Sequence, residues 1–243
     1  MLKGEKQFME LKKVLAGLEG LKAKGTLDID IKGIESNSKN IKPGYMFFAI
    51  KGFNTDGHDY INIAIEAGAN VIMVQEGCDL KSIKLKPDTT LVMYKDTREA
   101  LAKCSCNYYG NPSMKFKLIG VTGTKGKTTT TFMIKEILEK AGHKVGLIGT
   151  IATYLNGKML FESNRTTPES IELQKIFAQM VDEGVEYVVM EVSSQSLKLH
   201  RVDGCDFDIV LFTNFSEDHI SPNEHPDMKD YFESKLKLFE MCD

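Results

Sequence analysis

Near the middle of the chain, an apolar segment is followed by a glycine-rich run and then by a stretch of helix-forming residues. The run reads Gly120-Val121-Thr122-Gly123-Thr124-Lys125-Gly126-Lys127-Thr128-Thr129. Glycines let backbone N–H groups close around phosphate oxygens, and the start of the following helix presents its positive end. Lys127 adds a mobile cation, and Thr128 adds a hydroxyl suited to Mg²⁺. The pattern is typical of a loop that binds the phosphates of a nucleotide, most simply ATP.

The spacing departs from the usual pattern at one position. The first glycine of that pattern falls where this chain has Val121, so that Gly120 comes one residue too early. An ordinary glycine-rich turn would not explain a Gly-Lys-Thr-Thr sequence at a helix start, and we therefore keep the phosphate-loop interpretation. The residues expected to bind ATP are Gly123, Thr124, Lys125, Gly126, Lys127, Thr128 and Thr129.

Composition narrows the possible partners. With 243 residues the chain is long enough for two domains, and its net charge of -3 gives no broad attraction to nucleic acid or to an acidic membrane surface. No apolar run approaches the roughly 18 residues of a membrane span, and the N-terminal segment is charged and amphipathic, unlike a signal peptide. We expect a cytoplasmic chain with five reduced cysteines and no nucleic-acid or membrane partner.

The first part of the chain has the pattern of a small α/β domain. Apolar periodicity predicts helices over 8–21, 61–67 and 98–109, and strands over 27–34, 46–50, 71–74 and 90–94. The turn-forming run Gly110-Asn111-Pro112-Ser113 then breaks the pattern. We place the domain boundary there, with a first domain over 1–113 and a second over 114–243.

The second part alternates strands and helices more regularly. Strands are predicted over 117–121, 144–149, 187–192 and 207–212, helices over 127–141 and 228–241, and a hairpin turned by Asn156-Gly157. Thr167 and Pro168 suit the N-cap and first position of another helix. Such alternation predicts a mainly parallel sheet flanked by helices, with ligands at the carboxyl ends of its strands.

Polar side chains gather after two of these predicted strands. Glu191 and Ser193 end one strand, and Asp218 and His219 follow the next. Glu191 and His219 are the best candidates for Mg²⁺ ligands, and Asp218 is a weaker third. Each also has an ordinary structural explanation, as a strand-end carboxylate, a turn cap or a solvated imidazole. The nearby phosphate loop favours the functional interpretation.

Together, these motifs resemble those of the Mur ligase family, the ATP-dependent synthetases of peptidoglycan precursors. The resemblance spans nearly the whole chain. It rests on the compact phosphate loop, Met190-Glu191-Val192-Ser193-Ser194, His200-Arg201-Val202, Phe212-Thr213-Asn214-Phe215-Ser216-Glu217-Asp218-His219, and Tyr231-Phe232-Glu233-Ser234-Lys235. In the first domain, Asn37-Ser38-Lys39, Pro43-Gly44 and Gly52-Phe53-Asn54-Thr55-Asp56-Gly57 resemble a uridine-nucleotide site.

The resemblance implies a role for individual residues. Lys127, His219 and Lys235 would be catalytic, with Lys235 carbamylated, and the metal ligands would be Thr128, Glu191, His219 and Lys235. The substrate would contact Ser38, Asn54, Thr55, Thr166, Thr167, Ser193 and Arg201. The family usually has Asp-Ser-Arg in place of Asn37-Ser38-Lys39. The connection from His219 to the lysine helix is also longer than usual, so that His225 is an alternative histidine for the metal.

The resemblance also implies a reaction. ATP would phosphorylate the carboxylate of UDP-N-acetylmuramoyl-L-alanyl-D-glutamate, and the amine of an incoming amino acid would displace the phosphate. In the family a C-terminal domain binds this amino acid, and the resemblance implies that these residues do not include it, so that we expect a fragment without ligase activity of its own. Two alternatives remain: a noncatalytic nucleotide-binding module, and another amide ligase of the polyglutamate-adding or cyanophycin type. The identity of the third amino acid and the oligomeric state stay open.

Overall fold

The computed structural model describes residues 8–221 and 224–242. The chain divides into two compact units, residues 1–108 and 109–243, whereas the sequence analysis places the boundary after Ser113. Residues 109–113 belong with the second unit because Ser113 packs there, its Oγ accepting a hydrogen bond from the Asp206 amide at 3.1 Å. Within the described ranges, no helix combines the length and the apolar character needed to cross a membrane.

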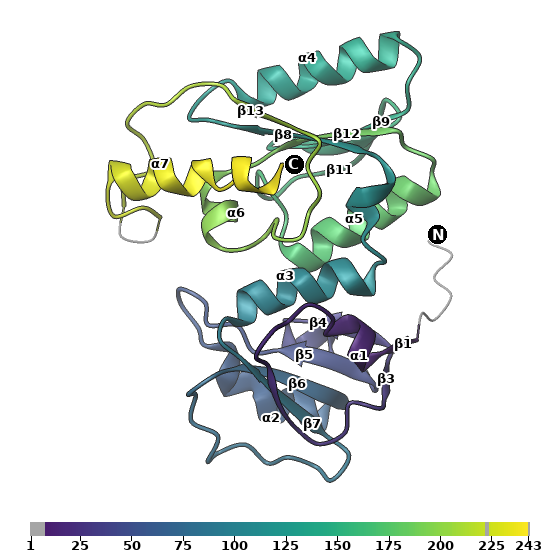
Figure 1. The fold of residues 1–243 in the computed structure, drawn as a ribbon, viewed down its shortest axis with the longest axis vertical. Helices are drawn as coiled ribbons and strands as arrows, with labels where there is room; N and C mark the ends of the chain where they lie inside the picture. Colours follow the sequence, from purple (N-terminus) through teal and green to yellow (C-terminus); the bar gives the residue numbers. More distant parts are fainter. Residues whose placement is uncertain (1–7, 222–223, 243) are drawn as a thin grey trace. The chain divides into compact units, whose positions relative to one another are not determined.

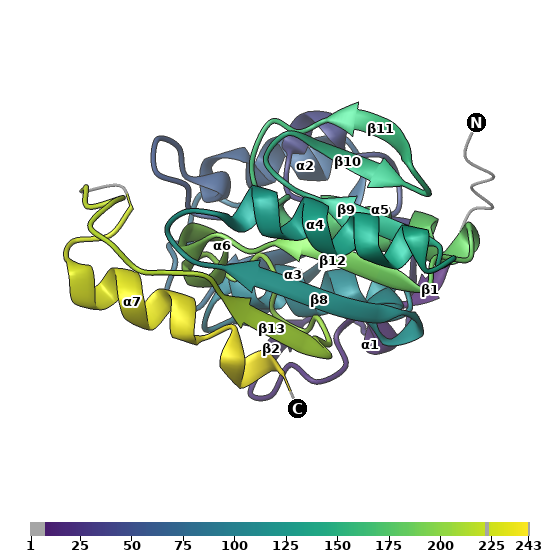
Figure 2. The ribbon, with the colours of Figure 1, turned by 90° about the horizontal axis from the view of Figure 1, so that it is seen from above.

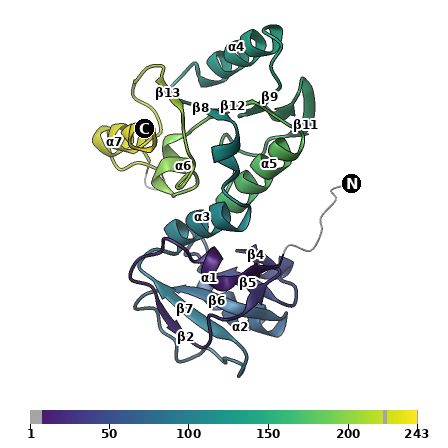
Figure 3. The same ribbon diagram turned by 45° about the vertical axis from the view of Figure 1, so that its right-hand side comes forward.

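The first unit is built on a five-stranded sheet with the order β2-β7-β6-β5-β4 (Figures 1 and 3). Its strands are β2 (Lys22–Lys24), β4 (Gly33–Glu35), β5 (Tyr45–Phe48), β6 (Ala69–Gln75) and β7 (Thr90–Tyr94), and β2 alone runs antiparallel to its neighbour. A separate pair joins β1 (Met9–Glu10) to β3 (Asp30–Ile31). The central strands are buried on both faces, as expected for a parallel sheet covered by helices.

Three α-helices accompany this sheet: α1 (Leu11–Val14), α2 (Ile61–Glu66) and α3 (Thr97–Tyr108). The predicted helices over 61–67 and 98–109 are confirmed, but the one predicted over 8–21 is much shorter. It ends early because the chain turns at Gly17, whose φ of 78° lies in the left-handed region that favours glycine. The strand predicted over 27–34 is likewise divided between β3 and β4.

The second unit has a six-stranded sheet with the order β11-β10-β9-β12-β8-β13 (Figure 2). The strands β8 (Lys117–Thr122), β9 (Val145–Ile148), β12 (Tyr187–Glu191) and β13 (Ile209–Phe212) are parallel. At the other edge, β10 (Ala152–Leu155) and β11 (Lys158–Glu162) form the predicted antiparallel hairpin around Asn156-Gly157. The predicted α/β class with parallel-dominated sheets is confirmed.

Helices cover both faces of this second sheet (Figure 1). On one face α4 (Lys127–Lys140) places Ile134 and Leu138 against Ile119, Val145 and Val189. The other face holds a larger apolar core shared by α5 (Ser170–Asp182) and α6 (Ser194–Lys198). The last helix, α7 (Met228–Leu236), is followed by a 3-10 turn over Phe239–Met241, so that the single helix predicted over 228–241 ends early. The carboxyl ends of β8, β12 and β13 therefore meet at one open edge.

Candidate functional site

The loop between β8 and α4 has the shape that phosphate binding requires. Gly123 has a φ of 138°, and Gly126 has a φ of 83° at the N-cap of α4. A Cβ on Gly123 would lie 2.0 Å from the Thr213 hydroxyl oxygen, so that no larger residue fits this backbone. The first amides of the 14-residue helix α4 face the loop, and this is the geometry of an anion site at a helix N-terminus.

Residues after β13 hold the phosphate loop in place. The amide of Thr124 donates to the Asn214 carbonyl at 2.9 Å, and the amide of Lys125 donates to Asn214 Oδ1 at 3.0 Å. In return, the Thr213 hydroxyl donates to the Lys125 carbonyl at 2.7 Å. The loop is therefore preorganised by a neighbouring strand, and it does not depend on its own glycines alone.

Lys127 and Lys235 point to the same loop from two helices. Lys127 Nζ donates to the carbonyls of Gly123 and Thr124 at 2.9 and 3.1 Å, and Lys235 Nζ donates to Gly123 at 2.9 Å. Lys235 is 1% exposed and lies 4.3 Å from the centre of the Tyr231 ring. Burial, followed by the charge of Lys127, lowers the pKa of Lys235 to about 7. Burial also lowers the pKa of Lys127, against the opposing effects of Glu191 and Asp218.

Glu191 is buried at the end of β12 and accepts hydrogen bonds from two neighbouring threonines. Thr128 Oγ1 donates to Glu191 Oε2 at 3.0 Å, while Thr150 donates through its amide at 2.9 Å and its hydroxyl at 3.1 Å. This places a carboxylate and a hydroxyl oxygen together at the start of α4. Hard oxygen ligands of this kind suit Mg²⁺.

The side chains do not form a complete metal cage. Within residues 8–221 and 224–242, no group of three or more His, Cys, Asp or Glu side chains is arranged to hold a metal ion. Mg²⁺ is commonly bound by one or two carboxylates together with substrate phosphates and water. Thr128 and Glu191 fit that arrangement, in which the nucleotide supplies the remaining oxygens.

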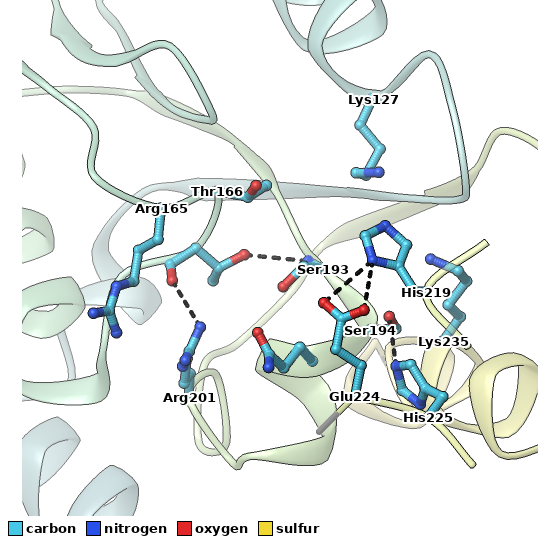
Figure 4. Close-up of a pocket in the computed structure, with 12 residues that line it drawn as sticks. Lys127, Arg165, Thr166, Ser193, Ser194, Arg201, His219, Glu224, His225 and Lys235 are labelled. Atoms are coloured by element: carbon cyan, nitrogen blue, oxygen red, sulfur yellow. Dashed lines mark hydrogen bonds and ion pairs between the residues drawn. The ribbon is translucent and has the colours of Figure 1, made fainter. Parts of the chain in front are cut away.

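A pocket of about 230 Å³ opens beside the loop (Figure 4). Its lining residues are Lys127, Arg165, Thr166, Thr167, Ser193, Ser194, Gln195, Arg201, His219, Glu224, His225 and Lys235. Figure 4 shows Arg165 and Arg201 on one side of the pocket and Lys127, His219 and Lys235 on the other. Basic groups on both sides favour an elongated anionic ligand that carries more than one acidic group.

Seven residues predicted from the sequence line this pocket together: Lys127, Thr166, Thr167, Ser193, Arg201, His219 and Lys235. The predicted N-cap role of Thr167 is wrong, because α5 begins at Ser170 with Glu169 at its N-cap. The Thr167 hydroxyl instead donates to the Glu191 carbonyl at 3.0 Å and accepts from the Ser193 amide at 3.1 Å. Thr167 therefore ties the pocket wall to the end of β12.

Arg201 and His219 occupy contrasting environments in the pocket. Arg201 pairs with Glu169 at 2.9 Å, and its side chain is 11% exposed. His219 has a side chain that is 46% exposed, and its Nδ1 lies 3.2 Å from Glu224 Oε2. The backbone of His219 has a φ of 56°, which is uncommon for a residue with a side chain. The imidazole is accessible at the pocket mouth, where it could reach a ligand.

The remaining predicted residues lie outside this pocket. Thr128 and Thr129 border a separate apolar groove along α4, lined also by Phe132, Met133 and Ile151. In the first unit, Ser38 and Thr55 line a pocket of about 290 Å³, where they lie with Tyr60. Asn54 is exposed and does not line it. The predicted long connection after His219 includes Pro222 and Asn223, which lie outside the described residues.

The sequence analysis missed several side chains that complete the site. Thr150 lies two residues after the end of β9, so the rule that identified Glu191 at a strand end could also have identified it. Tyr231, whose hydroxyl lies 3.2 Å from Thr124 Oγ1, gave no such signal because its position depends on where α7 packs. Ser194 and Asp230, which both contact His225, were missed for the same reason.

Comparison with known families identifies the class of protein that this fold and site define. Residues 121–243 match the Mur ligase middle domain, and residues 30–109 match the Mur ligase family catalytic domain. The chain therefore belongs to the Mur ligase family, as its motifs predicted.

Within this family, the chain is similar to ligases of one name. The UDP-N-acetylmuramoyl-L-alanyl-D-glutamate–2,6-diaminopimelate ligase of Clostridium tetani is 51% identical over 96% of this chain and 47% of its own length. The ligase of the same name from Clostridium botulinum is 53% identical over 87% of this chain and 43% of its own. The chain spans about half the length of the curated relatives it matches.

Solved structures show the same fold at much lower identity. A structure of UDP-N-acetylmuramoyl-L-alanyl-D-glutamate–2,6-diaminopimelate ligase matches 97% of this chain and 45% of its own with a TM-score of 0.74 at 19% identity. MurF ligase from Thermotoga maritima, solved in complex with ADP, matches 86% of this chain and 43% of its own with a TM-score of 0.57 at 22% identity.

Proposed function

We propose that this protein is part of an ATP-dependent amide ligase of peptidoglycan precursor synthesis, which adds the third amino acid to UDP-N-acetylmuramoyl-L-alanyl-D-glutamate. The names of the relatives favour 2,6-diaminopimelate as that amino acid. The observation that carries the proposal is the position of Lys127. Its Nζ atom donates to the Gly123 carbonyl of the phosphate loop, and its side chain also lines the basic pocket. A nucleotide phosphate and a second anionic substrate can therefore meet at one side chain.

The proposed reaction has two steps. The γ-phosphoryl group of ATP passes to the glutamate side-chain carboxylate, which gives an acyl phosphate and ADP. The amine of the incoming amino acid then attacks the acyl carbon and the amide bond forms. The nitrogen loses a proton to solvent, and phosphate leaves with the electrons of the broken C–O bond. Lys127 would offset the negative charge that spreads over the transferring phosphoryl oxygens. Arg201, with Thr166 and Ser193, would hold the carboxylate and peptide of the muramoyl substrate.

Thr128 and Glu191 would hold Mg²⁺, since they place two hard oxygens at the start of α4. When bound, the ion supplies positive charge against the phosphates of ATP. Glu191 is already oriented for this role by the two hydrogen bonds from Thr150. Thr150 would thus keep the carboxylate aimed at the loop, an orienting contact that metal ligands commonly need.

Lys235 would be carbamylated. With a pKa of about 7, much of its amine is neutral at physiological pH and carries a free lone pair. That lone pair attacks the carbon of CO₂, a C–N bond forms, and the nitrogen loses a proton to solvent to leave a carbamate anion. The product replaces a buried cation next to Lys127 with an anion, and with His219 it would offer ligands for a second Mg²⁺.

The first unit would bind the uridine nucleotide of the muramoyl substrate. Ser38 and Thr55 line its pocket, and the side chain of Asn37 accepts from the Lys39 amide at 3.1 Å, which shapes the turn at Ser38. Asn54 would contact this ligand from the exposed loop next to Thr55. Both proposed substrates, ATP and a UDP-linked precursor, fit a cytoplasmic location.

Calorimetry tests the proposal. The chain is titrated separately with Mg·ATP and with UDP-N-acetylmuramoyl-L-alanyl-D-glutamate, and saturable heat is expected for both. Lys127→Met should weaken Mg·ATP binding by about ten- to a hundredfold, because a charged hydrogen-bond donor is lost. Lys140→Met, at the exposed far end of α4, serves as the matched control. Binding of ATP without the UDP-linked ligand would favour a nucleotide-binding module or a different amide ligase, and heat with neither would reject the proposal.

A further inference from the structure

His225 lies between two helices of the second unit and has no exposed side-chain surface. Its Nε2 atom lies 2.9 Å from the hydroxyl of Ser194, the first residue of α6, and its Nδ1 atom lies 2.6 Å from Asp230 Oδ2 in the first turn of α7. Figure 4 shows the first of these contacts at the edge of the pocket. One imidazole therefore links α6 to α7.

The direction of these hydrogen bonds follows from the charge on Asp230. Burial alone would raise the pKa of Asp230, but hydrogen bonds and charge from Lys198 and His225 keep it below its ordinary value. Asp230 is then a carboxylate, which can only accept, so His225 Nδ1 carries the proton. Nε2 faces the Ser194 hydroxyl, which can either donate to it or accept from it. Both ring nitrogens are satisfied.

The same residue closes the base of the loop that carries His219 and Glu224. The amide of Ser221 donates to the His225 carbonyl at 3.0 Å. Lys198 Nζ donates to the Glu224 carbonyl at 3.0 Å and to Asp230 at 2.7 Å. The left-handed backbone of His219 is unfavourable for a residue with a side chain and persists only where the surroundings impose it. Lys198 of α6, and His225 through its contacts with α6 and α7, supply that constraint.

Ser194, His225 and Asp230 are hydrogen-bonded in the same succession, hydroxyl to imidazole to carboxylate, as the side chains of a nucleophilic serine site. In such a site the histidine must hand its proton to a leaving group. His225 has no exposed surface and Ser194 is only 5% exposed, so neither has the access that this transfer needs. The burial favours a positioning role over a catalytic one.

We propose that His225 is a positioning residue. Through Ser194 and Asp230 it fixes the described segments 219–221 and 224–227, and thereby holds His219 and Glu224 at the mouth of the pocket that contains Lys127 and Lys235. Its effect on ligand binding rests on the proposed function, whereas the anchoring of the loop does not. The network belongs entirely to the second unit.

The test compares His225→Asn, which keeps a donor near the Nδ1 position, with Ser194→Ala, which removes the other partner. Both should raise amide hydrogen exchange over residues 217–221 and 224–227 and weaken Mg·ATP binding by about two- to tenfold, the effect of one hydrogen bond. Because both variants break the same contact, the double variant should lose no more than either single one. His143→Asn is the matched control, since His143 pairs with Glu186 outside the pocket.

Several results would overturn the inference. These are unchanged exchange in the loop, multiplied losses in the double variant, or labelling of Ser194 by a fluorophosphonate, which would make it a nucleophile. A purely global effect would lower the melting temperature without changing affinity measured well below it. If His225→Asn fails to fold, hydrogen exchange and Mg·ATP affinity of Ser194→Ala still test the inference. If the unaltered chain does not bind Mg·ATP, the proposed function fails, while the exchange measurement still tests the anchor.

Discussion

Lys127 and Lys235 share one acceptor: the Nζ atom of each lies 2.9 Å from the carbonyl oxygen of Gly123. The two amines come from different helices, α4 and α7, and both donate to the phosphate loop. Burial lowers the pKa of both, and the charge of Lys127 further lowers that of Lys235. When both amines are protonated, below about pH 7, they form an unfavourable pair of like charges, which a bound anion would relieve.

Replacing Lys235 by Met should stabilise the protein most at low pH. The folded-state pKa of about 7 lies below the ordinary value of about 10.4, so the unfolded chain binds more protons between these values. The stability of the unaltered protein therefore rises with pH in this range, and the cost of the buried cation is full below pH 7. The advantage of Lys235→Met should shrink by about 2 kcal/mol between pH 7 and 9. Urea unfolding of both proteins in CO₂-free buffer at each pH measures this difference in the free energy of unfolding.

The matched control for this experiment is Lys229→Met on the same helix, where the lysine side chain is 82% exposed. Its effect should be small at every pH, since an exposed ion pair contributes little. An advantage of Lys235→Met that does not vary with pH would contradict the lowered pKa.

Glu191→Gln should remove the dependence of nucleotide affinity on Mg²⁺. The amide keeps an oxygen that can accept from Thr128 or Thr150 but loses the charge that would attract the ion. We expect ATP affinity in the presence of Mg²⁺ to fall by about ten- to a hundredfold, toward the value measured with a chelator. Calorimetry with and without Mg²⁺ provides both values. Glu186→Gln, next to His143 outside the pocket, should leave the response intact.

Gly123→Ala should disrupt the phosphate loop. The added Cβ would lie 2.0 Å from Thr213 Oγ1 and 3.1 Å from the Asn214 backbone, on a φ of 138°. We expect a loss of about 2–3 kcal/mol in the free energy of unfolding, together with loss of Mg·ATP binding. Gly142→Ala separates the two causes, because Gly142 has a φ of 95° but no heavy atom within 4 Å of its ideal Cβ. Equal destabilisation by both variants would argue against the steric clash.

Local sequence signals predicted the core of the second unit well. The strand predicted over 117–121 and the helix over 127–141 match β8 and α4 within one residue, because the glycines and the Lys-Thr pair mark the junction between them. The turn Asn156-Gly157 was likewise predictable, since both residues adopt positive φ, as a tight hairpin requires. At this junction and at this turn, the local backbone preferences of the residues are enough to determine the structure.

Contacts between distant segments could not be predicted. Thr167 has the sequence signature of an N-cap, yet its hydroxyl bonds to the end of β12 because the loop before α5 packs there. The bridge from Ser194 through His225 to Asp230 depends on α6 meeting α7, and no spacing rule encodes that meeting. The family resemblance brought Lys235 into consideration, but the burial that lowers its pKa is visible only in the fold.

The hydrogen bonds from Thr213 and Asn214 to the phosphate loop also have a consequence for synthesis of the chain. The loop is held by Asn214, which lies 89 residues after Lys125. At a typical elongation rate of about 5–20 residues per second, the loop is synthesised roughly 5–20 s before Asn214. Until β13 docks beside β8, the nascent loop lacks the bonds that hold its shape. The loop shape that the proposed nucleotide binding requires is thus acquired late, only after most of this unit has been translated.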